Sequence, residues 1–263
     1  MTTFTASDVP SLTGRTVVVT GANSGIGRSA ARVLAGRGAH VVLAVRNLDK
    51  GREAAAAMTG HVEVRRLDLA DLASVRAFAA DLTGPVDVLV NNAGIMIPPL
   101  SRTADGFESQ FGTNHLGHFA LTNLLLPRIR QRVVTVSSNA HRVGSIDFDD
   151  LQWERKPYRA MRAYAQSKLA NLLFTSELQR RLDEVGSPVV ATAAHPGMAA
   201  TNLLKPDGGR VRRLVQEKVT GLLAQSDDDG ALPTLYAAVA DVPGDSYVGP
   251  GGVLHSRGAP KPV

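Results

Sequence analysis

Short runs rich in β-branched residues alternate along this chain with longer stretches whose apolar residues have helical spacing. The runs that favour strands are Thr16–Thr20, His40–Val45, Val62–Leu67, Val86–Val90, Arg132–Val136 and Pro188–Ala194. They are almost continuously apolar, as expected of a parallel sheet that is buried on both faces. Helical patterns lie between them, at about 25–37, 49–59, 71–82, 106–130 and 158–184. This alternation predicts a doubly wound α/β domain with a mainly parallel central sheet and helices on both faces.

No linker, repeat or low-complexity tract divides the 263 residues. Because α/β sheets of this size are routinely one domain, we expect a single domain over residues 1–263. Two connections are longer than usual, an insertion at about 139–160 and a segment at about 202–225. Long connections in a compact domain are often functional, so both are candidates for shaping a binding site.

The composition excludes several classes of function. A chain without cysteine forms no disulfide, no thiolate zinc site and no cysteine nucleophile. The net charge is +5, but aromatic residues make up only 5% of the chain. The basic clusters therefore lack the stacking platforms of a nucleic-acid surface, and we expect no nucleic-acid partner.

Metal and membrane sites are not expected either. His115 and His118 share a helix face, but no third ligand is placed to complete a metal site. No stretch approaches 18 uninterrupted apolar residues, so no membrane span is predicted. The first residues have neither the basic nor the apolar region of a signal peptide, and we expect a cytoplasmic protein.

A glycine-rich turn, TGANSGIG, follows the first apolar run and opens the first helical stretch. Glycines allow a backbone to approach a pyrophosphate, and the helix N-terminus supplies oriented N–H donors and positive potential. A second strand follows about 20 residues on, which strengthens the signal. The turn predicts a dinucleotide site in a Rossmann-type domain, with candidate contacts at Gly21, Asn23, Ser24, Gly25, Ile26 and Gly27.

The glycine spacing, Gly-x3-Gly-x-Gly, resembles that of the short-chain dehydrogenase/reductase family. Four further stretches match the family in the same order: LDL at 67–69, NNAG at 91–94, NHLGHF at 114–119 and HPGMAAT at 195–201. By this resemblance Asp68 contacts the adenine, Asn91 lies near the adenosine ribose, and Thr201 binds the nicotinamide carboxamide. The remaining cofactor contacts that it implies are Leu69, Ala93, Gly94, Pro196 and Gly197.

The end of the second strand distinguishes between the two nicotinamide dinucleotides. An acidic residue there binds the ribose hydroxyls of NAD, whereas a nearby arginine pairs with the 2′-phosphate of NADP. This chain has Val45 at the acidic position and Arg46 next to it. The sequence therefore predicts NADP(H) as the cofactor.

The stretch AYAQSKLAN carries Tyr164 and Lys168 on one helix face, four residues apart. The fifth strand ends in VVTVSS, and the resemblance implies that Asn114, Ser138, Tyr164 and Lys168 form the family's catalytic tetrad. An ammonium about 4 Å from a phenol, at an effective dielectric near 20, favours the phenolate by about 4 kcal/mol. We therefore expect a pKa of about 7 for Tyr164, which suits general acid–base catalysis.

The resemblance also assigns the other members of the tetrad. Lys168 binds the nicotinamide ribose as well as tuning Tyr164, and Asn114 holds a water that links Lys168 to solvent. Ser138 donates a hydrogen bond to the substrate oxygen and stabilises its negative charge.

Four sequence motifs resemble those of the retinol-dehydrogenase-like and WW-domain-oxidoreductase-like branch of this family: SSNAH, DDL, AYAQSKLANLLF and YVGPGGVLHSRGAPKP. That branch handles lipophilic alcohols and carbonyls, which implies a hydrophobic or amphiphilic alcohol or carbonyl substrate. Residues 202–225 correspond to the family's substrate lid, with a membrane-contacting helix as the competing interpretation. In the insertion, Phe148 and Trp153 either pack it onto the body or line the pocket entrance.

Other readings of the function stay open. One is a ketoreductase of secondary metabolism, acting on a polycyclic or polyketide ketone. Another is a catalytically silent NADP-binding regulator, although such proteins usually lose the tyrosine or the lysine of the tetrad. The helices at about 106–130 and 158–184 are the usual dimer-forming faces of the family, while insertions before the tyrosine can block them, so a homodimer is open too.

Overall fold

The computed structural model describes residues 4–197, 226–252 and 255–263. In that part of the chain one sheet has the strand order β3-β2-β1-β4-β5-β6-β7-β8. All neighbours from β3 to β7 are parallel, and β8 is antiparallel to β7. The strands are β1 (Thr16–Thr20), β2 (His40–Val45), β3 (His61–Arg66), β4 (Val86–Asn91), β5 (Ile129–Val136), β6 (Val190–Ala194), β7 (Tyr247–Pro250) and β8 (Pro260–Pro262). The order runs outward from β1 in both directions, which confirms the doubly wound topology.

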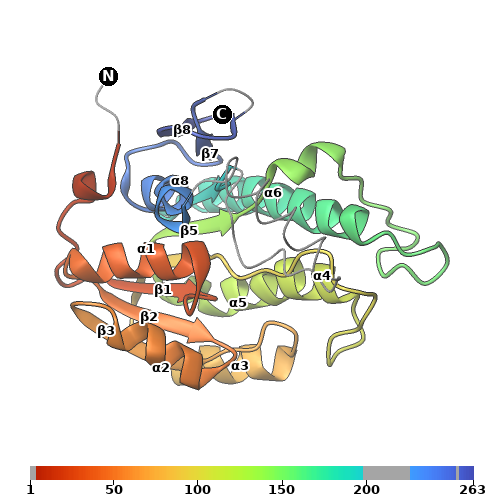
Figure 1. Ribbon diagram of the computed structural model, residues 1–263, viewed down its shortest axis with the longest axis horizontal. Helices are drawn as coiled ribbons and strands as arrows, with labels where there is room; N and C mark the ends of the chain where they lie inside the picture. Colours follow the sequence, from red (N-terminus) through yellow and green to blue (C-terminus); the bar gives the residue numbers. More distant parts are fainter. Residues whose placement is uncertain (1–3, 198–225, 253–254) are drawn as a thin grey trace, which may run out of the picture.

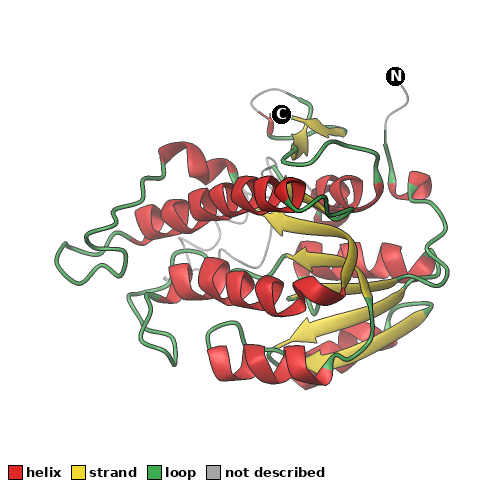
Figure 2. Ribbon diagram, turned by 180° about the vertical axis from the view of Figure 1, so that it is seen from behind, coloured by secondary structure: helices red, strands yellow, loops and turns green. Residues whose placement is uncertain are grey.

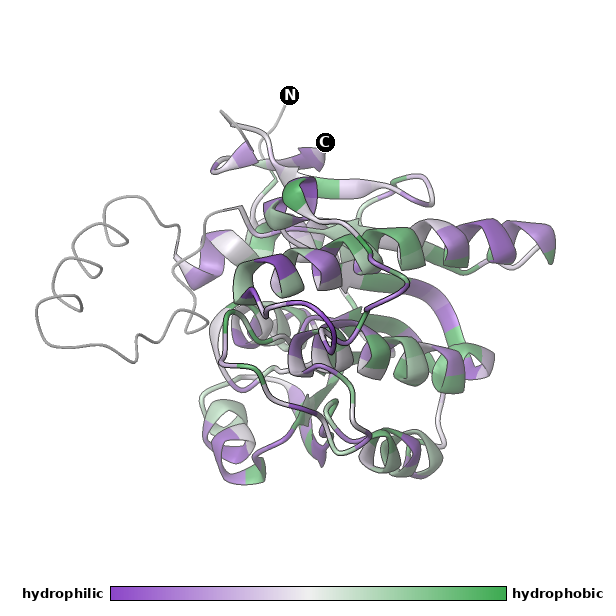
Figure 3. Cartoon of the chain, turned by 90° about the vertical axis from the view of Figure 1, so that its right-hand side faces the viewer, coloured by the Kyte–Doolittle hydropathy of each residue, from purple (hydrophilic) through white to green (hydrophobic). Residues whose placement is uncertain are grey.

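Helices cover both faces of this sheet (Figures 1 and 2). One face packs against α1 (Gly25–Gly36), α2 (Leu48–Ala56) and α8 (Asp227–Val239). The other packs against α3 (Leu72–Asp81), α5 (Gly117–Leu125) and the long α6 (Ala160–Glu184). The helices carry both polar and apolar colours in Figure 3, as expected of elements that bury one side.

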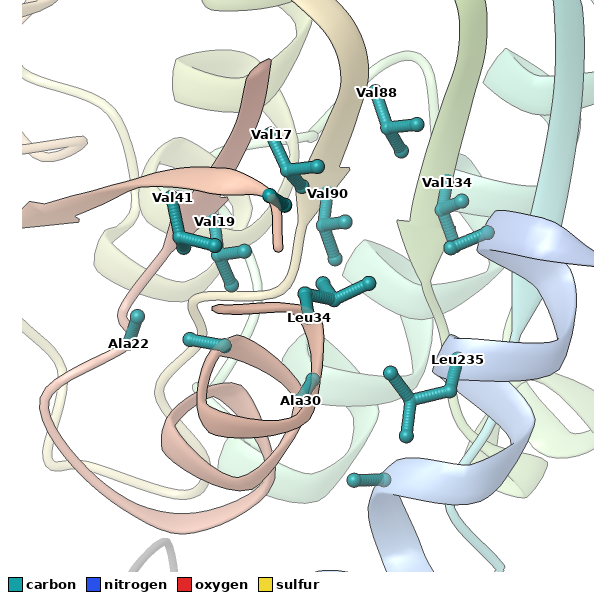
Figure 4. Close-up of a cluster of buried hydrophobic side chains, with 14 of the residues drawn as sticks. Val17, Val19, Ala22, Ala30, Leu34, Val41, Val88, Val90, Val134 and Leu235 are labelled. Atoms are coloured by element: carbon teal, nitrogen blue, oxygen red, sulfur yellow. The ribbon is translucent and has the colours of Figure 1, made fainter. Parts of the chain in front are cut away.

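Side chains alternate along the strands between two separate hydrophobic cores, one on each face of the sheet. Val17 and Val19 of β1 join the core under α1 and α8, whereas Val18 joins the opposite one. Figure 4 shows the first of these cores, where Leu34 of α1 and Leu235 of α8 lie below the strand valines. Side chains of successive strand residues point to opposite faces, so each apolar run fills both layers.

The helix expected at about 106–130 is interrupted. It consists of α4 (Ser109–Phe111), the π-helical segment η2 (Gly112–Leu116), α5 and the 3₁₀ turn η3 (Leu126–Arg128). Its expected end at residue 130 is wrong, because η3 contains Pro127 and β5 begins at Ile129. Wider turns of the π type often occur at functional positions, and this one contains Asn114.

The insertion at 139–160 holds the 3₁₀ segment η4 (Asn139–Val143) and reaches α6 without another helix or strand. Trp153 packs the insertion onto itself, since its ring meets that of Tyr158 at 5.6 Å and Lys156 Nζ lies 4.5 Å from its centre. Phe148 is instead 80% exposed. The two aromatic residues thus have different surroundings.

Some sequence features lie elsewhere or outside the description. The helix α8 and the strands β7 and β8 were not among the expected elements. Thr201 and the lid expected at 202–225 fall outside the described residues. In the part of the chain that is described, none of the helices has the length and apolarity to span a bilayer.

Candidate active site

The glycine-rich turn joins the end of β1 to the start of α1, and all six of its predicted cofactor contacts lie there. Gly21 and Gly25 have φ angles of 66° and 58°, in the left-handed region that favours glycine. A Cβ on Gly27 would lie 2.3 Å from Asn92 Nδ2 and 2.9 Å from the carbonyl oxygen of Gly21. The first two glycines therefore shape the turn, and the third lets α1 pack closely against β4.

Among the described residues, no side chain accepts a hydrogen bond from the first amides of α1. Ser24 is the N-cap residue, in an extended conformation, but its side chain makes no capping hydrogen bond. These N–H groups, together with the positive end of the helix dipole, form a donor set that suits an anionic diphosphate. On this ground the turn fits the dinucleotide that the sequence implies.

The NNAG stretch is tied to β1 and to α5. The Thr20 hydroxyl accepts hydrogen bonds from the backbone N–H groups of Asn92 and Ala93, both at 2.9 Å. Asn91 Nδ2 donates to Thr122 Oγ1 at 2.8 Å, while its buried Oδ1 has no partner among the described residues. Asn91 thus links the sheet to α5, and its Oδ1 is available to accept a hydrogen bond from a ligand.

The remaining predicted adenosine contacts lie at the ends of β2 and β3. Asp68 Oδ1 accepts from the backbone N–H of Ala70 at 3.0 Å, and Leu69 is buried. Val45 is buried as well, whereas Arg46 is exposed and has no ion-pair partner in the described parts of the chain. A guanidinium at this edge is available to an anion in solution.

At the carboxyl end of β6, Pro196 and Gly197 form a turn in which Gly197 has a φ of 69°. The backbone N–H of Gly197 donates to Nδ1 of the buried His195 at 3.2 Å. His195 in turn lies against the ring of Tyr247, with centroids 5.0 Å apart. Sequence reasoning gave His195 no part, yet it fixes the turn that leads toward Thr201.

The structure brings the tetrad residues together from three elements. Tyr164 and Lys168 lie on α6, Ser138 is the second residue after β5, and Asn114 comes from η2. Lys168 Nζ lies 5.7 Å from the centre of the Tyr164 ring, and the Ser138 side chain hydrogen-bonds the phenol. A Cβ on Gly94 would lie 3.3 Å from Asn114 Oδ1 and 3.6 Å from Lys168 Nζ. The NNAG turn therefore reaches the same site.

Two of these side chains are held by backbone groups. Lys168 Nζ donates to the carbonyl of Val136 at 3.0 Å. Asn114 Oδ1 accepts from the N–H of Ile95 at 2.8 Å, and its Nδ2 donates to the Ile95 carbonyl at 3.0 Å. Asn114 Nδ2 also lies 3.0 Å from Ser167 Oγ. Asn114 thereby joins the loop after β4 to α6.

The expected pKa of Tyr164 is wrong. Burial raises the pKa of this phenol above its ordinary value, although the hydrogen bond with Ser138 acts in the opposite sense. Burial also lowers the pKa of Lys168 to about 8, because its ammonium is withdrawn from water. The simple charge argument omitted this desolvation, which opposes the charged form of both residues.

A buried polar network beside the tetrad was not anticipated. Glu108 is fully buried and accepts from the backbone N–H groups of Gln110 and Phe111 and from the Tyr158 hydroxyl, at 2.9, 2.7 and 3.0 Å. Gln110 Nε2 donates to the Tyr158 hydroxyl at 2.8 Å, and Oε1 accepts from the N–H of Ile97 at 2.9 Å. Burial is the main reason why the pKa of Tyr158 is raised. The network ties the insertion to the loop after β4.

His118, placed on a helix face by the sequence, lies in the interior. Its Nε2 is 2.9 Å from Thr20 Oγ1, and its Nδ1 is 2.9 Å from the carbonyl oxygen of Asn114. Burial lowers the pKa of its imidazole to about 3, so the ring is neutral at physiological pH. In the part of the chain that the structure describes, no three histidine, cysteine or carboxylate side chains are grouped so that they could hold a metal ion.

Comparisons with known proteins agree with one another. The model of a family described as short chain dehydrogenase matches residues 15–150. Retinol dehydrogenase 13 of Homo sapiens is 46% identical over 243 residues, which cover 87% of this chain and 73% of that protein. Polyprenol dehydrogenase of Mus musculus is 44% identical over 248 residues, which cover 88% of this chain and 73% of that protein.

Two solved structures are also similar. An uncharacterised protein of Mycobacterium paratuberculosis superposes with a TM-score of 0.87 and 56% identity, over all of this chain and 89% of the other. A protein of Beutenbergia cavernae, described as an NAD(P)-dependent gluconate 5-dehydrogenase, has a TM-score of 0.65 and 29% identity, over 87% of this chain and 91% of that one. Its structure holds NADP at low occupancy.

Proposed function

The chain belongs to the short-chain dehydrogenase/reductase family, and from this we propose that it is an NADP(H)-dependent oxidoreductase for hydrophobic or amphiphilic alcohols and carbonyls. The observation that carries the proposal is the convergence of Tyr164, Lys168, Ser138 and Asn114 beside the NNAG turn. When bound, the nicotinamide supplies or accepts the hydride. The side chains of the protein move the proton and hold the substrate oxygen.

Tyr164 is the proton donor in reduction and the acceptor in oxidation. Ser138, which hydrogen-bonds the phenol, donates to the substrate oxygen and stabilises the negative charge that develops on it. Lys168 is positioned by the Val136 carbonyl, so its charge stays close to the phenol and favours the phenolate. Asn114 fixes the position of the loop after β4 relative to the helix α6, through its hydrogen bonds with Ile95 and Ser167.

The role of Tyr164 is tested with Tyr164→Phe. This variant is expected to lose turnover by a factor of at least about 10³ while it binds NADPH with nearly unchanged affinity, because only the proton relay is removed. Tyr236→Phe is the matched control, since Tyr236 packs at the edge of Phe4, away from the tetrad. Activity retained in Tyr164→Phe would refute the assignment.

Arg46 supports NADP(H) over NAD(H), because β2 ends without a carboxylate and with an exposed guanidinium. The neighbour from Beutenbergia cavernae with bound NADP agrees with this preference. We expect kcat/KM for NADPH to exceed that for NADH, and Arg46→Ala to reduce the ratio by about 10-fold. A wild-type enzyme that uses NADH at least as well would contradict the proposal.

The substrate class rests on the relatives, which are named for the oxidation of retinol and polyprenol. We expect long isoprenoid alcohols and aldehydes to be converted more efficiently than short polar ones. The measurement is kcat/KM over a panel matched in the reacting group, with polycyclic ketones included. Preference for the polycyclic ketones would instead favour a ketoreductase of secondary metabolism.

A homodimer is proposed as well. Phe119 and Leu124 of α5 and Leu173 of α6 are 47%, 44% and 52% exposed, which is unusual for large apolar side chains on neighbouring helices. Pairing of these faces would cover them. Light scattering should give twice the chain mass of 27.8 kDa, and the mass of one chain would contradict the dimer.

A further inference from the structure

The N-terminus of α8 lies against the first turns of α1, beside the glycine-rich turn. Asp228 makes the connection, because its Oδ1 accepts from Ser29 Oγ and from the Arg32 guanidinium, both at 2.7 Å. The two helices also share the core in which Leu34 and Leu235 pack (Figure 4). The start of α8 is therefore fixed relative to the turn.

Asp227, one residue earlier, faces that turn directly. Its Oδ1 lies 3.9 Å from the position that a Cβ on Gly25 would take. Apart from the adjoining residues and the backbone of α1 itself, no other atom of the described residues lies within 4 Å of that position. Gly25 is the first residue of α1, where the uncapped amides begin. The same Oδ1 is buried and has no hydrogen-bond partner in the described residues. An orphaned carboxylate oxygen thus stands at the opening of the diphosphate site.

Nearby charges explain why a partly buried carboxylate is tolerated at position 227. The positive ends of α1 and α8 both favour a carboxylate here, and Arg28 on α1 acts in the same sense. Burial and the neighbouring Asp228 oppose the charge and raise the pKa of Asp227. Arg32 is already paired with Asp228, and Asp229 hydrogen-bonds Ser226. Asp227 therefore lies in the positive electrostatic potential that would otherwise attract an anionic ligand.

We propose that Asp227 is an affinity-setting residue that repels the diphosphate of the dinucleotide and speeds its release. Diphosphate brings two negative charges to the same helix N-terminus. A carboxylate at this helix N-terminus repels them, and we expect about a 10-fold effect on affinity. The inference rests on the dinucleotide-binding part of the proposed function.

The test removes the negative charge at position 227 and keeps the shape of the side chain. Asp227→Asn should bind NADPH about 10-fold more tightly than the wild type, with most of the change in the release rate. Binding is followed by nicotinamide fluorescence and release by stopped flow, without substrate. The advantage should shrink as ionic strength rises, because salt screens the repulsion.

Asp229→Asn is the matched control. It removes the same charge from the same helix end, but Asp229 is exposed and its Oδ2 bonds Ser226. Its affinity should stay within about 2-fold of the wild type, since the charge is solvated. Equal tightening in both variants would show a general charge effect, and unchanged or weaker binding by Asp227→Asn would also overturn the proposal.

Two further ligands separate this inference from the choice of cofactor. NADH carries the same diphosphate, so Asp227→Asn should tighten NADH as well, whichever dinucleotide the wild type prefers. Adenosine 2′-monophosphate lacks the diphosphate and should bind both proteins equally. If NADH proves to be the better ligand, the NADP assignment fails while the comparison of Asp227→Asn with wild type still decides the role of Asp227.

Discussion

The site draws on a dinucleotide half, residues 15–94, and on a second half, residues 95–160. The two halves differ in which residue types adopt a left-handed backbone conformation. In the first half every described residue with left-handed φ is a glycine: Gly21, Gly25, Gly38 and Gly60. In the second half Ile97 and Trp153 both have a φ of 56°, alongside Gly106. A β-branched residue in this region is strained, whereas glycine is not.

Tertiary contacts explain how the second half tolerates its strain. The N–H of Ile97 is held by Gln110, which is itself held by Tyr158 of the insertion. Trp153 is buried and packed against Tyr158. Strain of this kind persists where the surroundings over-determine the conformation, and it gathers at functional sites. The backbone of the cofactor half therefore depends on local sequence, and that of the second half on contacts between residues far apart in the chain.

The largest expected effect tests the cofactor half. Gly27→Ala places a Cβ 2.3 Å from Asn92 Nδ2, and this amide also donates to the Thr20 carbonyl at 2.8 Å. Such overpacking costs about 1–3 kcal/mol, so thermal stability should fall. We expect NADPH affinity to drop by about 100-fold, because the same shift moves the amides of α1.

Gly36→Ala is the control for this prediction. Gly36 is the last residue of α1, and the atom nearest to a Cβ there would be Thr59 Oγ1, at 3.8 Å. Calorimetry and NADPH titration should show little loss for that variant. Equal losses in both variants would mean that the helix, rather than the close contact at Gly27, determines affinity.

Prediction from sequence succeeded where the signals are local. The bounds of β1 and β2 agree with those expected, and the glycine turn lies between β1 and α1, because strand, turn and helix follow within about 20 residues. The helix α8 was missed, and its interior Pro233 breaks the helical pattern. The interruption of the helix before β5 was missed too, since a single wider turn changes the spacing over only a few residues.

The candidate site could be predicted as a set of residues, but not in its energetics. All four tetrad residues were placed by motif, yet the pKa of Tyr164 was expected to fall and is raised. The argument counted the charge of Lys168 and omitted burial, which a sequence does not give. Likewise, Glu108 and Tyr158 are 50 residues apart, and no local pattern signals that they share a hydrogen bond.

The second prediction concerns the residue at which the two halves meet. His118 contacts Thr20 from the first half and Asn114 from the second. Its folded pKa of about 3 lies below the ordinary 6.5, so the unfolded chain takes up the proton first. Stability should therefore fall as pH drops below about 6.5, by up to about 1.4 kcal/mol per pH unit from this residue.

Urea unfolding between pH 7.5 and 4.5 measures that slope. The wild-type slope also includes His195, whose pKa burial lowers to about 4. His118→Gln should lose stability at neutral pH and show a slope smaller by about one proton. An unchanged slope would show that protonation of His118 does not control the acid sensitivity.

The smallest expected effect, that of Ile97→Gly, tests directly whether the strained backbone of the second half has a function. Ile97→Gly relieves the left-handed strain of a residue that is 42% exposed and close to Asn114 through Ile95. Because strain of this kind costs about 1–3 kcal/mol and glycine costs up to about 1 kcal/mol in entropy, the free energy of unfolding should rise by about 1 kcal/mol. At the same time kcat/KM for apolar alcohols should fall several-fold, since an apolar side chain two residues from the Asn114-bound Ile95 is lost. Leu100→Gly, an exposed apolar residue without positive φ, should not gain stability. A stability gain with unchanged kcat/KM would mean that the strain at Ile97 serves only the fold, and the contrast between the two halves would then carry no functional meaning.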